Sequence, residues 1–199
     1  MSNTEGAVRP EQLLVYYPTP VLQKVATLAT VEDLAKDDLV EKMFKVMNDH
    51  SGVGIAAPQI GVSKQVCIVR MLVPGEMKEL CHGDDPKYQG IVMLNPEVSG
   101  RGDLEEEVEG CLSCPGISAH VHRKSWVVVK WTDEVGIPRE MRFGNYAARI
   151  VQHEVDHLQG LCIINKLSPV DKITNAKALK VYDAMANRSR HAARSRQGR

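Results

Sequence analysis

Apolar residues recur at helical spacing over residues 31–50, and this pattern predicts the first long helix of the chain. Thr30 is a suitable N-cap because Asp33 follows three residues later, and Gly52 marks the expected end. The apolar positions that define the buried face are Leu39, Val40, Met43, Phe44, Val46 and Met47. An amphipathic helix of this kind packs one face against a sheet or another helix.

Two further helices are predicted nearer the C-terminus. Residues 145–158 form the first, with Asn145 as the expected N-cap and Gly160 placed to end it. The second covers residues 175–186 and leads into an arginine-rich end.

Most of the predicted strands precede the central helix. They cover residues 66–71, 91–94, 125–132 and 139–143, with a further short strand over 161–165. Residues 133–138 connect two of them as a hairpin, and residues 74–90 form a surface insertion rich in Pro, Gly and Asp. Because strands and helices do not alternate regularly, the fold class predicted is α+β.

Composition and charge narrow the class of protein. The 199 residues are 43% apolar and 25% charged, as in a globular protein with one main core. No apolar run approaches the ~20 residues of a membrane helix, and the N-terminal stretch lacks a signal-peptide core, so a cytoplasmic protein is expected. The five cysteines are expected to be reduced thiols rather than a disulfide framework.

The net charge of zero hides an asymmetry. Residues 172–199 contain eight Lys or Arg and one acidic residue, whereas residues 1–171 contain 17 Lys or Arg and 24 Asp or Glu. We therefore expect a main body over 1–171 and a basic C-terminal helix or tail over 172–199. Such a tail suggests either an anionic partner or a solubility device.

The strongest chemical signal is the segment Gln152-His153-Glu154-Val155-Asp156-His157. Histidines four residues apart on a helix lie on the same face, so both imidazoles can bind one metal ion. Glu154 lies beside them, in a suitable place for a general base acting on a water that the metal activates.

A third ligand must come from elsewhere in the chain. Cys111 of the segment Glu-Gly-Cys-Leu-Ser-Cys is one candidate, because a thiolate with two imidazoles leaves a fourth position for water, as in catalytic zinc sites. Cys114 allows another interpretation, in which both cysteines and both histidines form a closed structural zinc site.

The segment Gly52-Val53-Gly54-Ile55-Ala56-Ala57-Pro58-Gln59 is the third feature of interest. Glycines two residues apart, followed by small residues, indicate that another backbone approaches closely. The Gln59 amide could donate a hydrogen bond to a developing oxyanion.

In this order, the three segments GxGxAAxQ, EGCxS and QHExDH resemble the peptide deformylases, and the resemblance covers roughly residues 13–170. It implies an α+β fold in which antiparallel strands surround the central HExxH helix. It also implies removal of the N-formyl group from the first methionine of new polypeptides, with release of formate.

The resemblance further implies roles for individual residues. The metal would be bound by Cys111, His153 and His157. It would be Fe²⁺, or alternatively Zn²⁺ or another divalent ion, because thiolate and imidazole donors suit both Fe²⁺ and Zn²⁺. Glu154 would accept a proton as hydroxide attacks the formyl carbon and return it to the departing amine.

The remaining roles concern the oxyanion and the substrate. The Gln59 amide and the backbone N–H of Leu112 would hold the tetrahedral oxyanion. The substrate backbone would bind as an added strand, and apolar side chains would line the methionine pocket. The residues expected to bind substrate are Val53, Gly54, Gly110 and Ile150.

Two positions depart from the family pattern. Ser118 stands where many deformylases carry an arginine near the downstream substrate backbone, which puts the subsite preference in question. Cys114 replaces a residue that is commonly Val or Ile, and it is expected to make the site sensitive to oxidation.

Partners and competing functions complete the expectations. The expected partner is an N-formyl-Met peptide substrate. The enzyme is expected to be a monomer that does not bind a membrane. The basic tail resembles, in position and charge, C-terminal extensions that bind the ribosome. Two rival functions are a zincin-type peptidase and a non-enzymatic binding module built on the closed Cys₂His₂ site.

Overall fold

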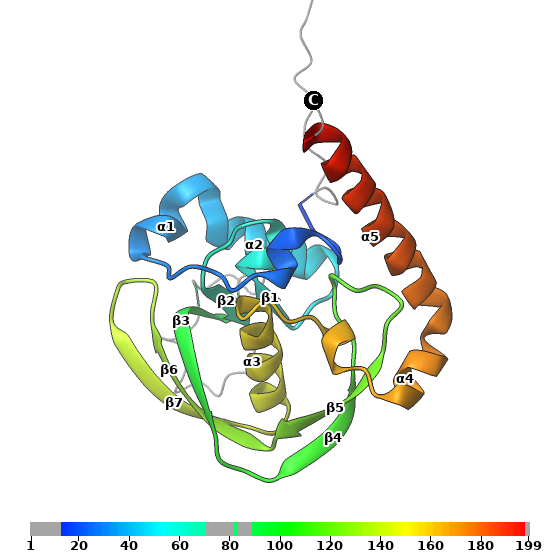
Figure 1. Cartoon of the computed structure of the whole chain (residues 1–199). Helices are drawn as coiled ribbons and strands as arrows, with labels where there is room; N and C mark the ends of the chain where they lie inside the picture. Colours follow the sequence, from blue (N-terminus) through cyan, green and yellow to red (C-terminus); the bar gives the residue numbers. More distant parts are fainter. Residues whose placement is uncertain (1–12, 71–81, 83–88, 198–199) are drawn as a thin grey trace, which may run out of the picture.

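The computed structural model describes residues 13–70, 82 and 89–197, and its strands form two antiparallel sheets (Figure 1). The larger sheet has the order β1–β2–β3–β6–β7, formed by Gly54–Ala56, Val66–Val69, Ile91–Gly100, Trp126–Thr132 and Pro138–Gly144. The smaller sheet pairs β4 (Leu104–Glu109) with β5 (Ala119–Lys124). Every strand pair in both sheets is antiparallel.

Helix α3 (Asn145–Leu158) lies in the concave space between the sheets and contacts strands of both (Figure 1). Its bounds are those predicted from the sequence, although Gly144 rather than Asn145 takes the N-cap position. Gly160 follows the helix in the left-handed conformation, with a φ of 74°, as expected for a residue that ends a helix. Strands around a central helix confirm the predicted α+β fold.

The predicted helix over residues 31–50 is divided into two helices. These are α1 (Val31–Ala35) and α2 (Leu39–Asp49), separated by the 3₁₀ turn Lys36–Asp38. Asp37 and Asp38 both have a φ of 52°, a left-handed conformation that aspartate tolerates better than most residues. The hydrophobic periodicity continues across this break, so the pattern alone could not reveal it.

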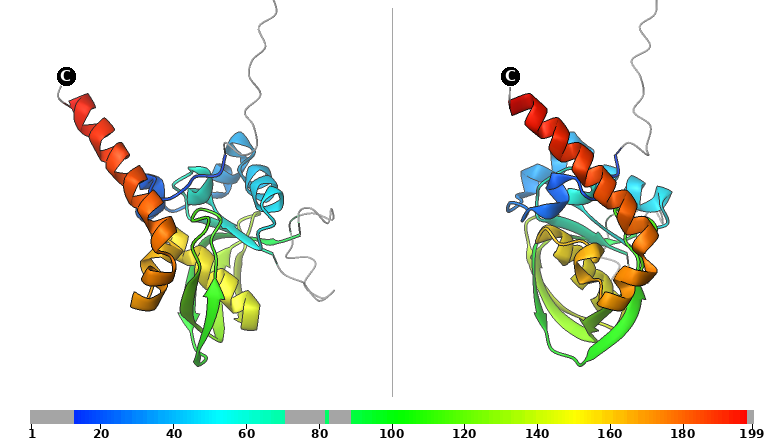
Figure 2. Two further views of the ribbon diagram at one scale, coloured as in Figure 1. Left: turned by 90° about the vertical axis from the view of Figure 1, so that its right-hand side faces the viewer. Right: turned by 45° about the vertical axis from the view of Figure 1, so that its right-hand side comes forward.

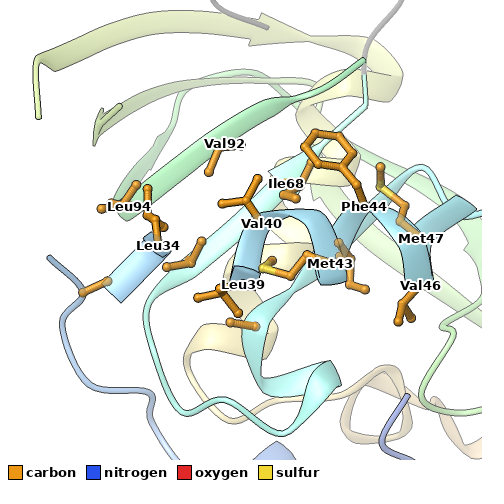
Figure 3. Close-up of a cluster of buried hydrophobic side chains, with 14 of the residues drawn as sticks. Leu34, Leu39, Val40, Met43, Phe44, Val46, Met47, Ile68, Val92 and Leu94 are labelled. Atoms are coloured by element: carbon orange, nitrogen blue, oxygen red, sulfur yellow. The ribbon is translucent and has the colours of Figure 1, made fainter. Parts of the chain in front are cut away.

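The buried face of α2 packs against the larger sheet. Figure 3 shows its side chains facing Ile68 of β2 together with Val92 and Leu94 of β3. A second cluster joins the apolar face of α3 to β2, β3, β6 and β7. A third fills the space beside β5 and contains Leu22, Cys114, Ile117, Ala119, Val121, Cys162, Ile163, Leu167 and Tyr182.

The C-terminal region contains two helices, α4 (Pro169–Thr174) and α5 (Ala176–Gln197). Helix α5 is longer than the predicted helix over 175–186, and Figure 2 shows its C-terminal part extending past the body. Its first half is attached, because the buried Tyr182 donates a hydrogen bond of 2.8 Å from its hydroxyl to the carbonyl of Pro115. In the described part of the chain, no helix combines the length and apolar character needed to cross a membrane.

Other elements differ from the prediction. The strand predicted over 161–165 is wrong, because Ile163–Lys166 form a 3₁₀ helix in which the side chain of Asn165 bonds to the backbone N–H of Cys162. Strands β1, β4 and β5 and helix α4 were not predicted. The insertion predicted over 74–90 lies largely outside the described residues.

Candidate active site

A cavity of about 440 Å³ opens between β1, the β4–β5 connection and α3. All the residues predicted for the site line it except His157, which is buried. The lining members of the predicted set are Val53, Gly54, Gln59, Gly110, Cys111, Leu112, Ile150, His153 and Glu154. Three segments that are far apart in the sequence thus meet around one space.

Helix α3 positions the two histidines because its opposite side is apolar. Val151 and Leu158 are buried against the larger sheet, which turns the histidine side toward the cavity. The rings of His153 and His157 lie edge to face with centroids 5.1 Å apart. Adjacent turns of one helix therefore present two nitrogen donors to the same point.

Cys111 reaches this point from the turn that follows β4. The N–H of Cys114 donates to the carbonyl of Cys111 at 3.0 Å and closes the turn. The Cys111 sulfur lies 3.2 Å from Nε2 of His157, and one donor atom from each of Cys111, His153 and His157 lies within 4.8 Å of the others. One thiol and two imidazoles are thus gathered as in a three-ligand catalytic metal site.

The protonation of this group reflects close electrostatic coupling. A hydrogen bond with the Cys114 thiol, with help from the positive charge of His157, lowers the pKa of Cys111 well below its ordinary value despite burial. Burial alone would lower the pKa of His153, but hydrogen bonds to Cys111 and Glu109 raise it to about 9. The sulfur therefore favours the thiolate form that a metal requires.

Glu109 lies behind His153 and holds its ring in place. Nδ1 of His153 donates to Oε2 of Glu109 at 2.9 Å. Arg123 donates to both carboxylate oxygens at 2.9 Å, and Nη1 of Arg149 adds a bond of 2.7 Å to Oε1. Burial by itself would raise the pKa of Glu109, but the bonds from Arg123 and His153 hold it well below its ordinary range.

Glu154 is buried at the cavity wall, and its Oε2 has no hydrogen-bond partner among the described residues. Burial raises the pKa of this carboxyl to about 7. A Cβ atom on Gly54 would overlap the Glu154 carboxylate and approach Cγ2 of Ile150 to 2.8 Å. Gly54 is therefore glycine because α3 and β1 approach too closely for a side chain there.

Gln59 is oriented by its own loop. Its Oε1 accepts a hydrogen bond of 2.8 Å from the backbone N–H of Ala56. Its amide nitrogen therefore faces the cavity, 3.8 Å from the Cys111 sulfur and 3.3 Å from the hydroxyl of Ser113. The amide N–H groups thus point toward the metal-ligand group, in the direction that oxyanion stabilisation would need.

Ser118 lies next to one wall of the cavity and is fixed through its backbone. The side chain of Asn175 donates to the Ser118 carbonyl at 2.7 Å and accepts from its N–H at 3.0 Å. Nearby, Nδ1 of His120 donates to Asp171 at 2.7 Å. Helix α4 and Asn175, which follows it directly, therefore hold the segment in which the departure from the family pattern occurs.

Sequence reasoning missed two groups behind the histidines. One is the ion-pair network of Glu109, Arg123 and Arg149, which has no local signal in the sequence because Arg123 stands at an inward strand position that is normally apolar. The other is Cys162, whose sulfur lies 3.8 Å from Nδ1 of His157.

The geometry also bears on the closed Cys₂His₂ alternative. Within the described residues, the group able to hold a metal contains Cys111, His153 and His157, and the Cys114 sulfur is not a member. Cys114 instead packs in the apolar cluster that contains Leu22 and Tyr182.

Comparison with known proteins places this site in a family. Residues 12–173 match the family described as polypeptide deformylase. A peptide deformylase of Thermosynechococcus vestitus is 35% identical over 162 residues, covering 79% of each chain. One from Thermodesulfovibrio yellowstonii is 36% identical over 167 residues, covering 82% of this chain and 93% of its own.

Solved structures are similar over most of the chain. A peptide deformylase from Legionella pneumophila has a TM-score of 0.71 at 33% identity, covering 88% of this chain and 96% of its own. One from Synechococcus elongatus in complex with actinonin has a TM-score of 0.72 at 28% identity, covering 92% of both chains. With the sequence match and the shared fold together, the chain belongs to the polypeptide deformylase family of hydrolases.

Proposed function

We propose that this chain removes the formyl group from N-formyl-Met peptides with a divalent metal held by Cys111, His153 and His157. The observation that carries the proposal is the gathering of these three donor groups within 4.8 Å, beside a buried carboxylate. Fe²⁺ is the proposed ion, and the same thiolate and imidazole donors would also hold Zn²⁺.

The donor set fits such an ion in its chemistry and in its surroundings. The Glu109 carboxylate bonds to the second nitrogen of His153, as is common for ligating imidazoles, and the Cys162 thiol lies at the second nitrogen of His157. A divalent metal bound there would act as a Lewis acid and lower the pKa of a water molecule, supplying a nucleophile at neutral pH.

Glu154 is proposed as the group that moves the proton. Burial raises the pKa of its carboxyl to about 7, and its Oε2 is left without a partner among the described residues. In the reaction, Glu154 accepts a proton from the water whose oxygen attacks the formyl carbon, and passes that proton to the amine as the C–N bond breaks and formate is released.

Gln59 and the backbone N–H of Leu112 are proposed to stabilise the oxyanion. The carbonyl oxygen of the Gln59 side chain is already bonded to Ala56, so its NH₂ group faces the cavity, where it donates to the Cys111 sulfur and the Ser113 hydroxyl. Leu112 follows the ligand Cys111 directly and lines the same cavity. Donors fixed before the reaction stabilise developing charge without reorganisation.

The substrate is proposed to bind along β1 and the Gly110 backbone. Strand β1 lies at the edge of the larger sheet, where an extended peptide can add as a further strand. No described atom lies within 4 Å of the position that a Cβ on Gly110 would occupy. Val53 and Ile150 would contact the methionine side chain.

The test compares peptides and variants in one assay. Formate should be released from a formyl-Met peptide, whereas the unformylated peptide should not be cleaved. Cleavage of the unformylated peptide would instead indicate a zincin-type peptidase. Glu154→Gln should keep its metal and lose about 10²–10⁴-fold or more in turnover. Turnover near that of the wild type with metal bound would contradict the role of Glu154.

The basic C-terminal region carries a second, separate proposal. We divide the chain into a catalytic part over 1–171 and a basic part over 172–199. We propose that the enzyme is cytoplasmic and monomeric, and that its basic part binds the ribosome. Eight Lys or Arg against one acidic residue support this, since phosphate contacts favour such a segment.

Truncation after Ala186 tests this proposal, because the cut leaves the attachment of Tyr182 intact. Hydrolysis of a short formyl-Met peptide should be unchanged, while ribosome binding at low salt should weaken. For the full-length protein, binding should fall steeply as salt is raised. Equal ribosome binding by the full-length and truncated proteins would contradict the proposal and indicate that the basic region only increases solubility.

A further inference from the structure

Three of the four described cysteines gather around one ligand histidine. The Cys111 sulfur lies 3.2 Å from Nε2 of His157, and the Cys162 sulfur lies 3.8 Å from Nδ1 of the same ring. The backbone N–H of Cys114 closes a turn with Cys111 at 3.0 Å, and the Cys114 side chain packs in the same buried cluster as that of Cys162. Cys114 therefore connects a proposed metal ligand to a second, buried thiol.

The three thiols differ in exposure. Cys111 is half-buried and lines the cavity, Cys114 is buried at the cavity wall, and Cys162 is buried in the cluster beside β5 without lining the cavity. A small oxidant that enters the cavity thus reaches Cys111 before it reaches Cys162. Oxidation of a thiol beyond the sulfenic acid is largely irreversible. A neighbouring thiol that reacts with the sulfenic acid before further oxidation therefore protects the oxidised cysteine.

The backbone permits a bond between the first pair. Cys111 and Cys114 are the ends of a four-residue turn closed by a hydrogen bond of 3.0 Å, and the ends of such turns lie less than ~7 Å apart. This overlaps the range of about 4.4–6.8 Å between Cα atoms in disulfides. Cys162 reaches the same place from the start of the 3₁₀ helix Ile163–Lys166.

We propose that Cys114 and Cys162 form a disulfide that removes oxidation from Cys111. A hydroperoxide first oxidises the Cys111 thiol to a sulfenic acid, and its O–O bond breaks to release an alcohol, or water from hydrogen peroxide. The Cys114 thiol then attacks the Cys111 sulfur, which forms a disulfide and releases water. The Cys162 thiol finally attacks the Cys114 sulfur, giving the Cys114–Cys162 disulfide and returning Cys111 as a thiol.

The two electrons that reduce the peroxide come in the end from Cys114 and Cys162. Cys111 is thus oxidised only transiently and is again free to bind metal. The proposed sulfur chemistry needs the three thiols and not the catalytic function, although its benefit rests on the proposed role of Cys111 as a ligand.

The experiment follows the sulfur atoms by mass spectrometry. All proteins carry Cys81→Ser, since Cys81 lies outside the described residues, and are loaded with Zn²⁺, which has no redox chemistry of its own. After limiting hydrogen peroxide, the parent should lose the mass of two hydrogen atoms. Its peptide map should link Cys114 to Cys162 and show Cys111 unmodified.

Two variants separate the steps. Cys162→Ser should stop at a Cys111–Cys114 disulfide and lose its Zn²⁺. Cys114→Ala should form neither disulfide and should gain two oxygen atoms at Cys111 as a sulfinic acid. Cys114→Ser, which is closer in size, repeats this test should the alanine variant fold poorly, and circular dichroism checks both.

Cys67→Ser is the matched control, because Cys67 is equally buried but packs in a different cluster on β2. It should behave as the parent does. Sulfinic acid at Cys111 forming equally fast in the parent and in the Cys114 variants would overturn the proposal. A disulfide between any other pair in the parent would also overturn it. Zinc content and formate release are measured separately, so a failure of the metal-site assignment is distinguished from a failure of the thiol exchange.

Discussion

Replacing Glu109 with glutamine tests whether the buried charges behind His153 position the metal site. The Glu109 carboxylate accepts four hydrogen bonds, two on each oxygen. Oε1 receives bonds from Arg123 and Arg149, and Oε2 receives bonds from Arg123 and His153. In Glu109→Gln, the amide NH₂ must face two donors whichever way it turns, and one negative charge is lost.

The magnitude follows from the burial of this network. The side chains of Glu109 and Arg123 are each only 6% exposed, and that of Arg149 is 7% exposed. Removing one partner from a buried ion pair costs about 3–5 kcal/mol, because the remaining charges stay buried without compensation. The network that orients His153 is also disturbed, so metal affinity should fall by about 10–100-fold.

The assay is urea unfolding of the metal-free protein, followed by a metal competition titration. Glu107→Gln is the matched control, because Glu107 also pairs with Arg149, at 3.1 Å, but its side chain is 56% exposed. An exposed pair contributes only about 0–1 kcal/mol. A loss as small as the control's for Glu109→Gln would refute the argument from burial. Unchanged metal affinity would show that the network stabilises the fold without orienting His153.

Three further predictions concern Gly54, Gly110 and the pair of His120 with Asp171. Gly54→Ala should destabilise the protein by about 1–3 kcal/mol in urea unfolding, because the added Cβ meets Ile150 at 2.8 Å; a fully stable variant would contradict this. Gly110→Ala, where no described atom lies within 4 Å, should keep its stability and raise the KM for a formyl-Met peptide; an unchanged KM would remove Gly110 from the substrate path. The bond to His120 lowers the pKa of Asp171 from 3.8 to about 2, and the same bond raises the pKa of His120 above 6.5. The stabilisation that this pair gives the folded protein should therefore be fully present between about pH 4 and 6.5. It should fade as the pH falls toward 2 or rises through the pKa of His120, and a His120→Ala unfolding difference that stays constant from pH 2 to 9 would contradict the pairing.

The elements that sequence predicted well are those whose pattern is local. The α3 bounds follow from helical periodicity and from Gly160, which adopts the left-handed φ that ends a helix. The hairpin of β6 and β7 follows from an apolar run in β6 and an alternation of charged and apolar residues in β7, joined by a short turn. In both cases, neighbouring residues carry the information.

Strands β4 and β5 could not be predicted because their pattern has meaning only in the folded chain. In β4, every residue from Leu104 to Val108 is exposed, so no apolar alternation exists. In β5, Arg123 occupies an inward position that would normally be apolar. Burial of this charge is favourable only because Glu109 and Asp156 arrive from elsewhere in the sequence.

The candidate site shows the same division between local and long-range information. The histidines and Glu154 lie within one helical segment, and the three motifs carry the resemblance that names Cys111, Gln59 and Gly54. What lies behind the ligands cannot be found in this way. Cys162 lies in none of the three motifs, yet its sulfur contacts the His157 ring.

The two histidines of the HExxH segment, although equivalent in spacing, are therefore chemically different. His153 donates Nδ1–H to a carboxylate whose charge is held by two arginines, which strengthens the imidazole as a donor to metal. His157 has a thiol at the corresponding nitrogen, and a thiol is a weak and oxidisable partner. A change in the state of Cys162 thus acts directly on His157 and not on His153. The ring of His153 is held by buried charge, whereas the ring of His157 contacts a sulfur atom whose redox state can change.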